Sequence, residues 1–102
     1  MSGRARVLIW HRAPEDAPGA VEEAYRSISG ELEGTPGLLG NELLAACDDG
    51  ARLLVMSEWE SLAAFQKWEG GADHRGATSP LRPYQDRDRE RFFEVYEVRA
   101  SF

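Results

Sequence analysis

The stretch Leu53–Trp68, LLVMSEWESLAAFQKW, decides the fold because its hydrophobic period changes partway along it. The first part, Leu53–Trp59, is a short apolar run that follows a turn signal at Asp48-Asp49-Gly50, so it predicts a β-strand. From Leu62 onward the apolar residues recur at every third position, at Leu62, Phe65 and Trp68. That spacing follows one face of a helix, and the sequence therefore predicts a strand that leads directly into a helix.

The two ends of this helix carry their own signals. Glu60-Ser61 supplies side-chain oxygens that can accept from the first unpaired backbone N–H groups. We expect Gly70-Gly71 to end the helix, because glycine adopts the left-handed conformation at low cost. This arrangement brings Trp59, Trp68 and His74 close together. We therefore expect any chemistry of this protein near Trp68 and His74.

The residues before this stretch predict a strand and an amphipathic helix. Arg6–His11 is a short apolar run, and alternation puts Val7, Ile9 and His11 on one of its faces. The next helix is expected to start at Asp16-Ala17-Pro18 and to end at Gly34 with Thr35-Pro36-Gly37. Its apolar stripe consists of Val21, Ala24, Tyr25, Ile28 and Leu32.

Two more strands complete the pattern. Leu38–Ala46 predicts the second strand, with Leu39, Asn41 and Leu43 on one face. A helix over its NELLAAC portion is the alternative, but the flanking Pro-Gly and Asp-Asp-Gly turns suit a strand that enters a hairpin. Phe92–Val98, FFEVYEV, predicts the fourth strand. Residues 69–90 are polar and force little regular structure.

The element order is therefore β-α-β-β-α-β, an α+β arrangement known as the split βαβ or ferredoxin-like fold, in one domain over residues 1–102. It predicts a four-stranded antiparallel sheet with both helices on one face. The other face would leave apolar side chains in water, so we expect a second copy of the chain to cover it in a homodimer. The residues expected on that face include Leu8, Trp10, Leu44, Leu54, Met56 and Tyr96.

Composition and charge argue against several classes of partner. The chain of 102 residues is 42% hydrophobic and 29% charged, and its 12 basic and 18 acidic residues give a net charge of −6. This charge argues against nucleic acid and against anionic membranes as partners, and no apolar run approaches the roughly 20 residues of a membrane helix. Cys47 has no partner for an internal disulfide, and the N-terminus lacks signal-peptide features. We therefore expect a cytoplasmic protein.

Three segments resemble the antibiotic biosynthesis monooxygenase family: TPGLLGNELL at 35–44, LLVMSEWESLAAFQKW at 53–68 and FFEVYEV at 92–98. The resemblance implies a dimeric α+β barrel. Through the polyketide-tailoring oxygenases of this family, it also implies O₂ chemistry without metal, flavin or heme.

The chain also resembles the heme-degrading branch of the same superfamily, in AFQKW and in His74-Arg75. Trp68 matches a helix tryptophan that contacts heme in that branch. Ile9 or Trp10 stands where that branch carries an asparagine. His74 matches a second His-Arg pair of that branch better than it matches the heme ligand, which lies further past the helix tryptophan.

The candidates for catalysis are His74, Asn41, Trp68 and Arg82. His74 is either a base or ligand, or an exposed loop histidine, and Trp68 is either a pocket wall or core. Asn41 lies on an apolar strand face, where its amide must pair with a backbone group or with a substrate carbonyl. Arg82 could hold an enolate or a carboxylate.

The candidates for substrate binding are Tyr25, Phe65, His11 and Tyr84. Tyr25 and Phe65 could form an apolar slot, and Tyr84 lies in a loop that could cover the mouth of a cavity. His11 could also act as a base, although its place at the end of a strand favours a position at the rim. No metal site is predicted, because the chain has two histidines and neither a C-x-x-C nor an H-x-x-x-H spacing.

These features together favour a small oxygenase that acts on a planar phenolic or anthrone-like molecule. Such chemistry needs a base, an apolar slot and donors for the enolate oxygen, and the substrate carbanion then passes an electron to O₂. A heme-binding monooxygenase is the alternative enzyme. The alternative outside enzymes is a non-catalytic dimeric accessory protein of a biosynthetic pathway, for which we expect a cavity filled by side chains.

Overall fold

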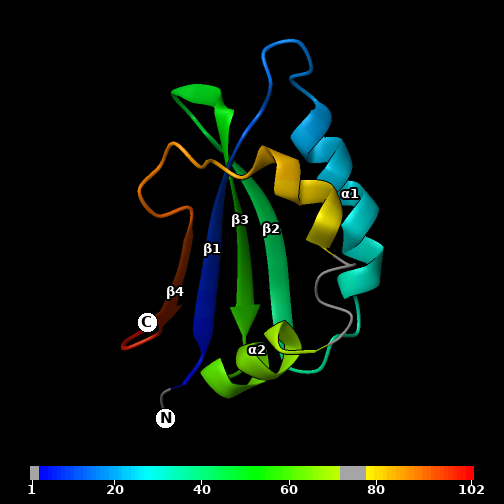
Figure 1. The fold of residues 1–102 in the computed structure, drawn as a ribbon. Helices are drawn as coiled ribbons and strands as arrows, with labels where there is room; N and C mark the ends of the chain where they lie inside the picture. Colours follow the sequence, from blue (N-terminus) through cyan, green and yellow to red (C-terminus); the bar gives the residue numbers. More distant parts are fainter. Residues whose placement is uncertain (1–2, 72–77) are drawn as a thin grey trace.

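The computed structural model describes residues 3–71 and 78–102 (Figure 1). Its elements are β1 (Ala5–Arg12), α1 (Ala20–Leu32), β2 (Leu38–Ala46), β3 (Asp49–Trp59), α2 (Leu62–Glu69), the 3₁₀-helix η1 (Ser79–Tyr84) and β4 (Phe93–Glu97). This confirms the β-α-β-β-α-β order. η1 adds regular structure to a stretch for which the sequence predicted little, and it has a proline in its first turn, where the missing N–H donor is not needed.

The four strands form one antiparallel sheet in the order β2-β3-β1-β4. The inner strand β1 pairs Val7 with Ser57 of β3 on one side and with Val95 of β4 on the other. α1, α2 and η1 lie on one side of this sheet (Figure 1), as the ferredoxin-like arrangement predicts. Across 3–71 and 78–102, no helix is both long enough and apolar enough to cross a membrane.

Alternation along the strands places one set of residues under the helices. The buried residues on this helical face of β1 and β3 are Ala5, Val7, His11, Leu53, Val55, Ser57 and Trp59. Val21, Ile28 and Leu32 of α1 belong to one core cluster, and Phe65 of α2 packs with Trp59 in another. Burying a large apolar side chain stabilises the fold by about 1.5–3 kcal/mol. These buried side chains of α1 and α2 therefore hold the two helices on the sheet.

The helix ends agree with the sequence in part. The predicted cap at Ser61 is confirmed, because its hydroxyl oxygen accepts from the Ala64 N–H at 3.0 Å. α1 begins at Ala20, later than predicted, since hydrogen-bonded turns at 14–17 and 17–20 precede it. α2 does end at Gly70 as predicted, but the left-handed conformation expected there is wrong, because Gly70 has φ −80°. Gly34 does adopt the left-handed conformation, with φ 82°, after α1.

The strand β2 contains a bulge that changes which side chains reach the core. Its register shifts just after Leu38, so Leu38 packs against both core clusters while Leu39 is 54% exposed. The predicted grouping of Leu39 with Asn41 and Leu43 is therefore wrong for Leu39, because the extra residue of a bulge resets the alternation. Asn41 and Leu43 do face the helices. β3 begins at Asp49, before the predicted start, because the hairpin turn is confined to residues 47–48.

The face of the sheet opposite the helices carries apolar side chains beside charged ones, which include the ion-paired Arg6 and Glu58. The half-buried apolar members are Leu8, Trp10, Leu54 and Met56, and the exposed apolar members are Leu39, Leu44 and Tyr96. The guanidinium carbon of Arg89 lies 3.8 Å from the centroid of the Trp10 ring. We call this set the open face, because all the described helices pack on the other side of the sheet.

Candidate functional site

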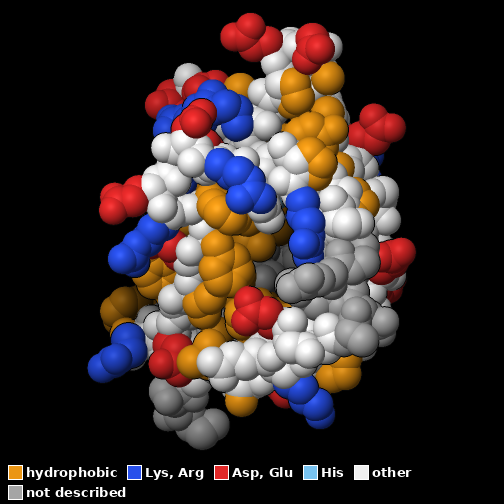
Figure 2. Space-filling view, in the orientation of Figure 1, with side chains coloured by type: hydrophobic (Ala, Val, Ile, Leu, Met, Phe, Trp, Pro, Cys, Tyr) orange, Lys and Arg blue, Asp and Glu red, His pale blue; other side chains and the backbone are white. Residues whose placement is uncertain are grey.

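A cavity of about 400 Å³ lies between the helical face of the sheet and the elements α1, α2 and η1. Its base includes the strand residues His11, Asn41 and Ser57, and its walls include Phe65 and Trp68 of α2. Exposed residues mark its opening, namely Glu69, Arg87 and Phe93. Figure 2 shows hydrophobic side chains in the middle of this side of the molecule, with basic and acidic side chains around them. Concave, mostly apolar sites with a few polar groups are typical of small-molecule binding.

An aromatic cluster forms the wall of the cavity next to α2. The Trp68 ring lies with its centroid 5.3 Å from that of Trp59 and 6.3 Å from that of Phe65, and Phe93 of β4 lies 6.2 Å from Phe65. Trp59 itself is a core residue, because it is 1% exposed and its indole N–H donates to the Ser57 hydroxyl at 2.9 Å. Both tryptophans line the cavity, and Trp68, which is half-buried, is the more accessible of the two.

His11 lies at the base of this cavity and is 2% exposed. The rim position expected from its place at a strand end is therefore wrong. The physical reason is that β1 continues to Arg12, so that His11 pairs with Leu53 of β3 on one side and bridges to Gln85 on the other. Strand pairing on both sides holds His11 within the sheet, and its side chain is buried at the base of the cavity.

The imidazole of His11 is held in one tautomer. Its Nδ1 lies 2.9 Å from the carbonyl oxygen of Ile9, and because a carbonyl can only accept, Nδ1 carries the proton and Nε2 carries the lone pair. Burial lowers the pKa of His11 below its ordinary 6.5, although the bond to Ile9 acts in the opposite direction, so the ring is neutral at pH 7. Among the described side chains, no nitrogen or oxygen is buried without a hydrogen-bond partner. Nε2 is therefore the nitrogen of this imidazole that can accept a proton.

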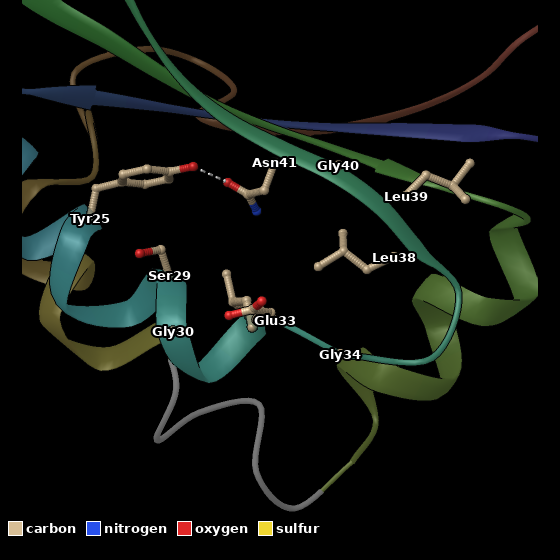
Figure 3. Close-up of a pocket in the computed structure, with 10 residues that line it drawn as sticks. Tyr25, Ser29, Gly30, Glu33, Gly34, Leu38, Leu39, Gly40 and Asn41 are labelled. Carbon is tan, nitrogen blue, oxygen red and sulfur yellow. Dashed lines mark hydrogen bonds between the residues drawn. The ribbon is translucent and has the colours of Figure 1, made fainter.

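Asn41 is tied to α1 by a side-chain hydrogen bond. The Tyr25 hydroxyl donates to Oδ1 of Asn41 at 2.8 Å (Figure 3), so the amide pairs with a phenol and not with the backbone group that the sequence suggested. Burial, and then the negative charge of Glu42, raises the pKa of Tyr25, which keeps the hydroxyl a donor. Asn41 lines both the cavity and a more open depression of about 430 Å³ beside α1. Its NH₂ group can therefore donate to a bound molecule.

The structure gathers most of the predicted site residues. His11, Asn41, Phe65, Trp68 and Arg82 line the cavity. Tyr25 lines the outer depression and reaches the cavity through Asn41. Tyr84 lines a separate depression near Pro14 and Asp86, so it is not part of this site. His74 falls outside the described residues.

Sequence reasoning missed several polar residues of the cavity, which among the described residues are Ser57, Glu69, Thr78, Gln85 and Arg87. Ser57 could have been found, because alternation puts this polar residue on the apolar face of β3. Gln85 and Arg87 lie in a polar segment without periodicity, which offers no such signal. Among the residues in 3–71 and 78–102, no group of three His, Cys, Asp or Glu side chains could hold a metal ion.

Comparison with known proteins agrees with this arrangement. The sequence profile of the family described as antibiotic biosynthesis monooxygenase matches residues 5–80. Protein SchA of Streptomyces halstedii is 28% identical over 81 residues, which are 79% of this chain and 21% of SchA. The chain thus spans about a fifth of that relative. The mycobilin-producing heme oxygenase of Mycobacterium tuberculosis is 35% identical over 66 residues, which cover 62% of this chain and 63% of that enzyme.

Solved structures share the fold. SnoaB, a cofactor-independent oxygenase from Streptomyces nogalater, superimposes with a TM-score of 0.73 over 100% of this chain and 96% of its own, at 16% identity. At this identity the likeness establishes the architecture, whereas the sequence profile covers most of the chain from β1 into η1. The chain therefore belongs to the antibiotic biosynthesis monooxygenase family.

Proposed function

We propose that this protein is a cofactor-independent monooxygenase that oxidises a planar, phenolic or anthrone-like intermediate of secondary metabolism with O₂. The observation that carries the proposal is the neutral, buried imidazole of His11 at the base of a cavity walled by aromatic rings. Membership in the family and the similarity to SchA support an oxygenase role. The cavity is not filled by side chains, which weighs against the non-catalytic accessory alternative.

The proposed reaction begins with proton removal from the acidic carbon of the substrate. Nε2 of His11 takes this proton, because it carries the lone pair and lies in the cavity. The enolate oxygen that forms needs a donor, and the NH₂ group of Asn41 can provide one. The ring system lies against Trp68 and Phe65, which exclude water from the charged intermediate.

The carbanion then transfers one electron to O₂, and the resulting radical and superoxide combine to form a peroxide anion. Proton return from His11 gives the hydroperoxide, which loses water to leave a carbonyl group. One oxygen atom enters the product, the other leaves as water, and the substrate carbon supplies all the electrons. His74 remains a predicted additional base, because its place in the site lies outside the described residues.

Oxygen uptake with dithranol or a related anthrone tests this function. The wild-type protein should consume O₂ faster than buffer, and Trp68→Ala, Asn41→Ala and His11→Gln should each lower the rate. Ser29→Ala offers a matched control, since Ser29 lines the outer depression and not the cavity. A wild-type rate equal to that of buffer, or equal rates in all variants that keep their folded circular dichroism spectrum, would overturn the proposal. His74→Ala tests the additional base.

A heme-binding monooxygenase is the second candidate, favoured by the 35% identical heme oxygenase. In the part of the chain that the structure describes, His11 is the residue that can offer an imidazole nitrogen within the cavity. Hemin titration separates the two candidates. A sharp Soret shift at one heme per chain that is lost in His11→Ala or His74→Ala would promote the heme enzyme, whereas a featureless spectrum would remove it.

We also propose that the protein is a homodimer in the cytoplasm. The open face presents Leu39, Leu44 and Tyr96 to solvent at 54%, 39% and 51% exposure, and an identical open face on a second copy is its natural cover. The cavity lies on the opposite side of the sheet and stays accessible in such a dimer. The exposed free thiol of Cys47 suits a reducing compartment.

A further inference from the structure

Two polar side chains lie opposite each other on the helical face of the sheet. Asn41 of β2 pairs with Ser57 of β3 in the strand register, and both residues line the cavity. Directly opposed residues of an antiparallel pair have Cβ atoms about 4.5–5.5 Å apart. On the other side of Ser57 the same row continues to Val7 and Val95, which are apolar. The polar side chains of this row therefore lie together over β2 and β3.

The hydroxyl group of Ser57 has an unused donor. Ser57 is 8% exposed and, with His11, is one of two buried polar residues in the part of the chain that the structure describes. Its oxygen accepts from the indole N–H of Trp59 at 2.9 Å, and its O–H donates to no acceptor within 3–71 and 78–102. A hydroxyl that already accepts one hydrogen bond is polarised and donates more strongly. The Ser57 O–H is therefore available to a molecule in the cavity.

Asn41 has the same arrangement. Its Oδ1 accepts from the Tyr25 hydroxyl at 2.8 Å, and its NH₂ group donates to no acceptor among the described residues. In both residues a neighbouring aromatic side chain thus occupies the oxygen and leaves a donor unpaired. A carbonyl or enolate oxygen has at least two lone pairs, so one such oxygen can accept from both donors at once.

We propose that the Ser57 hydroxyl and the Asn41 NH₂ group form a two-donor site that binds one oxygen atom of the substrate. The proposal rests on the proposed function and deepens it, because it adds a second donor to the enolate oxygen that Asn41 serves there. Donors that are fixed before the reaction stabilise the negative charge that develops on that oxygen. The bond from Trp59 matters because it turns the Ser57 oxygen away from the role of acceptor.

An inert ketone tests the two-donor site without any turnover. 9-Fluorenone and fluorene have the same planar rings, but only fluorenone has a carbonyl oxygen, and its carbonyl carbon carries no hydrogen to remove. Isotope-edited infrared spectroscopy of bound fluorenone should show the C=O stretch at a lower frequency than in hydrocarbon solvent, because the donated hydrogen bonds weaken the C=O bond. Tryptophan fluorescence should show fluorenone binding about fivefold or more tightly than fluorene.

Variants assign this shift to the two side chains. Ser57→Ala should raise the C=O frequency and weaken fluorenone binding by about two- to tenfold, the effect of one hydrogen bond, with fluorene binding unchanged. Ser57→Thr keeps the hydroxyl and should restore the low frequency. Asn41→Leu should raise the frequency only partway, because the Ser57 donor remains. Ser27→Ala is the matched control, since this exposed serine donates to the Ala24 carbonyl on α1 and does not line the cavity.

Ser57→Ala also leaves the buried Trp59 N–H without its acceptor, so circular dichroism checks its fold and Asn41→Leu provides an independent test. A frequency in folded Asn41→Leu equal to that in hydrocarbon would overturn the proposal. So would a wild-type protein that binds fluorenone no better than fluorene, or an unchanged frequency in folded Ser57→Ala. A Ser57-dependent frequency in a protein that does not oxidise anthrones would sustain the two-donor site and remove the proposed oxygenase. Anthrone oxidation with a frequency independent of Ser57 would do the reverse.

Discussion

The hydroxyl group of Tyr25 and the amide oxygen of Asn41 are 2.8 Å apart and join the middle of α1 to the edge strand β2. The contact lies where the cavity meets the outer depression, since Asn41 lines both. It leaves the NH₂ group of Asn41 as the donor that a ligand could use, because Oδ1 is occupied by the phenol. A single phenol thus orients a proposed oxyanion donor from outside the cavity.

Replacing Tyr25 with Phe removes this hydrogen bond while keeping the ring. The free energy of unfolding should fall by about 0.5–1.5 kcal/mol, the usual contribution of one such bond, and the anthrone oxidation rate should fall because the amide is free to turn. Urea unfolding and oxygen uptake measure the two effects. If Asn41→Ala lowers the rate but Tyr25→Phe does not, the phenol does not orient the amide.

Lowering the pH should destabilise the protein through His11. Burial lowers the folded-state pKa of His11 below 6.5, so in the window between that value and 6.5 the unfolded chain binds a proton that the folded chain does not. The free energy of unfolding should therefore drop as the pH falls below about 6.5 and should gain nothing more from this residue above it. Urea unfolding from pH 8 to pH 5 should show a smaller drop in His11→Gln. Parallel profiles for the two proteins would mean that the imidazole is not desolvated.

The same pKa sets the pH dependence of the proposed reaction. A base must be unprotonated, so the oxygen uptake rate should stay level above pH 6.5 and decline only at the lower pH where His11 takes up its proton. Initial rates across this range, measured on protein that remains folded, check the expectation. A decline that begins above pH 6.5 would point to another base.

Gly37 is required where the chain enters β2. Its φ is 84°, and a Cβ atom there would lie 2.5 Å from the Cβ of Ala64 in α2, so Gly37→Ala should lower the free energy of unfolding by more than about 1 kcal/mol. Gly30→Ala is the control, because a Cβ at this position in α1 meets open space and alanine favours a helix by about 0.8–1.0 kcal/mol. The free energy of unfolding measured by chemical denaturation should therefore fall in Gly37→Ala and rise in Gly30→Ala. An unchanged free energy of unfolding in Gly37→Ala would show that the start of β2 can move away from α2.

The homodimer can be tested without any knowledge of the reaction. Met56 lies on the open face, opposite Leu8 of β1 and Glu42 of β2. Met56→Asp should dissociate or unfold the dimer, because it would bury an unpaired charge. Sedimentation equilibrium at micromolar concentration measures this. A folded wild-type monomer under these conditions would show that a second copy does not cover the open face.

The sequence by itself determined the order of the elements and the faces of the strands, except at Leu39 beside the bulge of β2. The change of period between Leu53 and Trp68 is a local property, because side chains alternate along a strand and recur every three to four residues along a helix. The same local rules identified the Ser61 cap and the apolar stripe of α1. They also brought Trp59 and Trp68 together, because few residues separate a strand end from the helix that follows it.

Tertiary structure alone decided the depth and the partners of the site residues. His11 is buried because β3 and Gln85 pair on either side of it, and Asn41 meets Tyr25 because α1 crosses β2 at that point. Arg82 lines the cavity from a 3₁₀-helix that no hydrophobic periodicity in the sequence predicted. The bulge after Leu38, which exposes Leu39, depends on pairing with β3. Each of these features arises from contacts between residues that are distant along the chain. A local sequence pattern holds no information about which distant residue makes the contact.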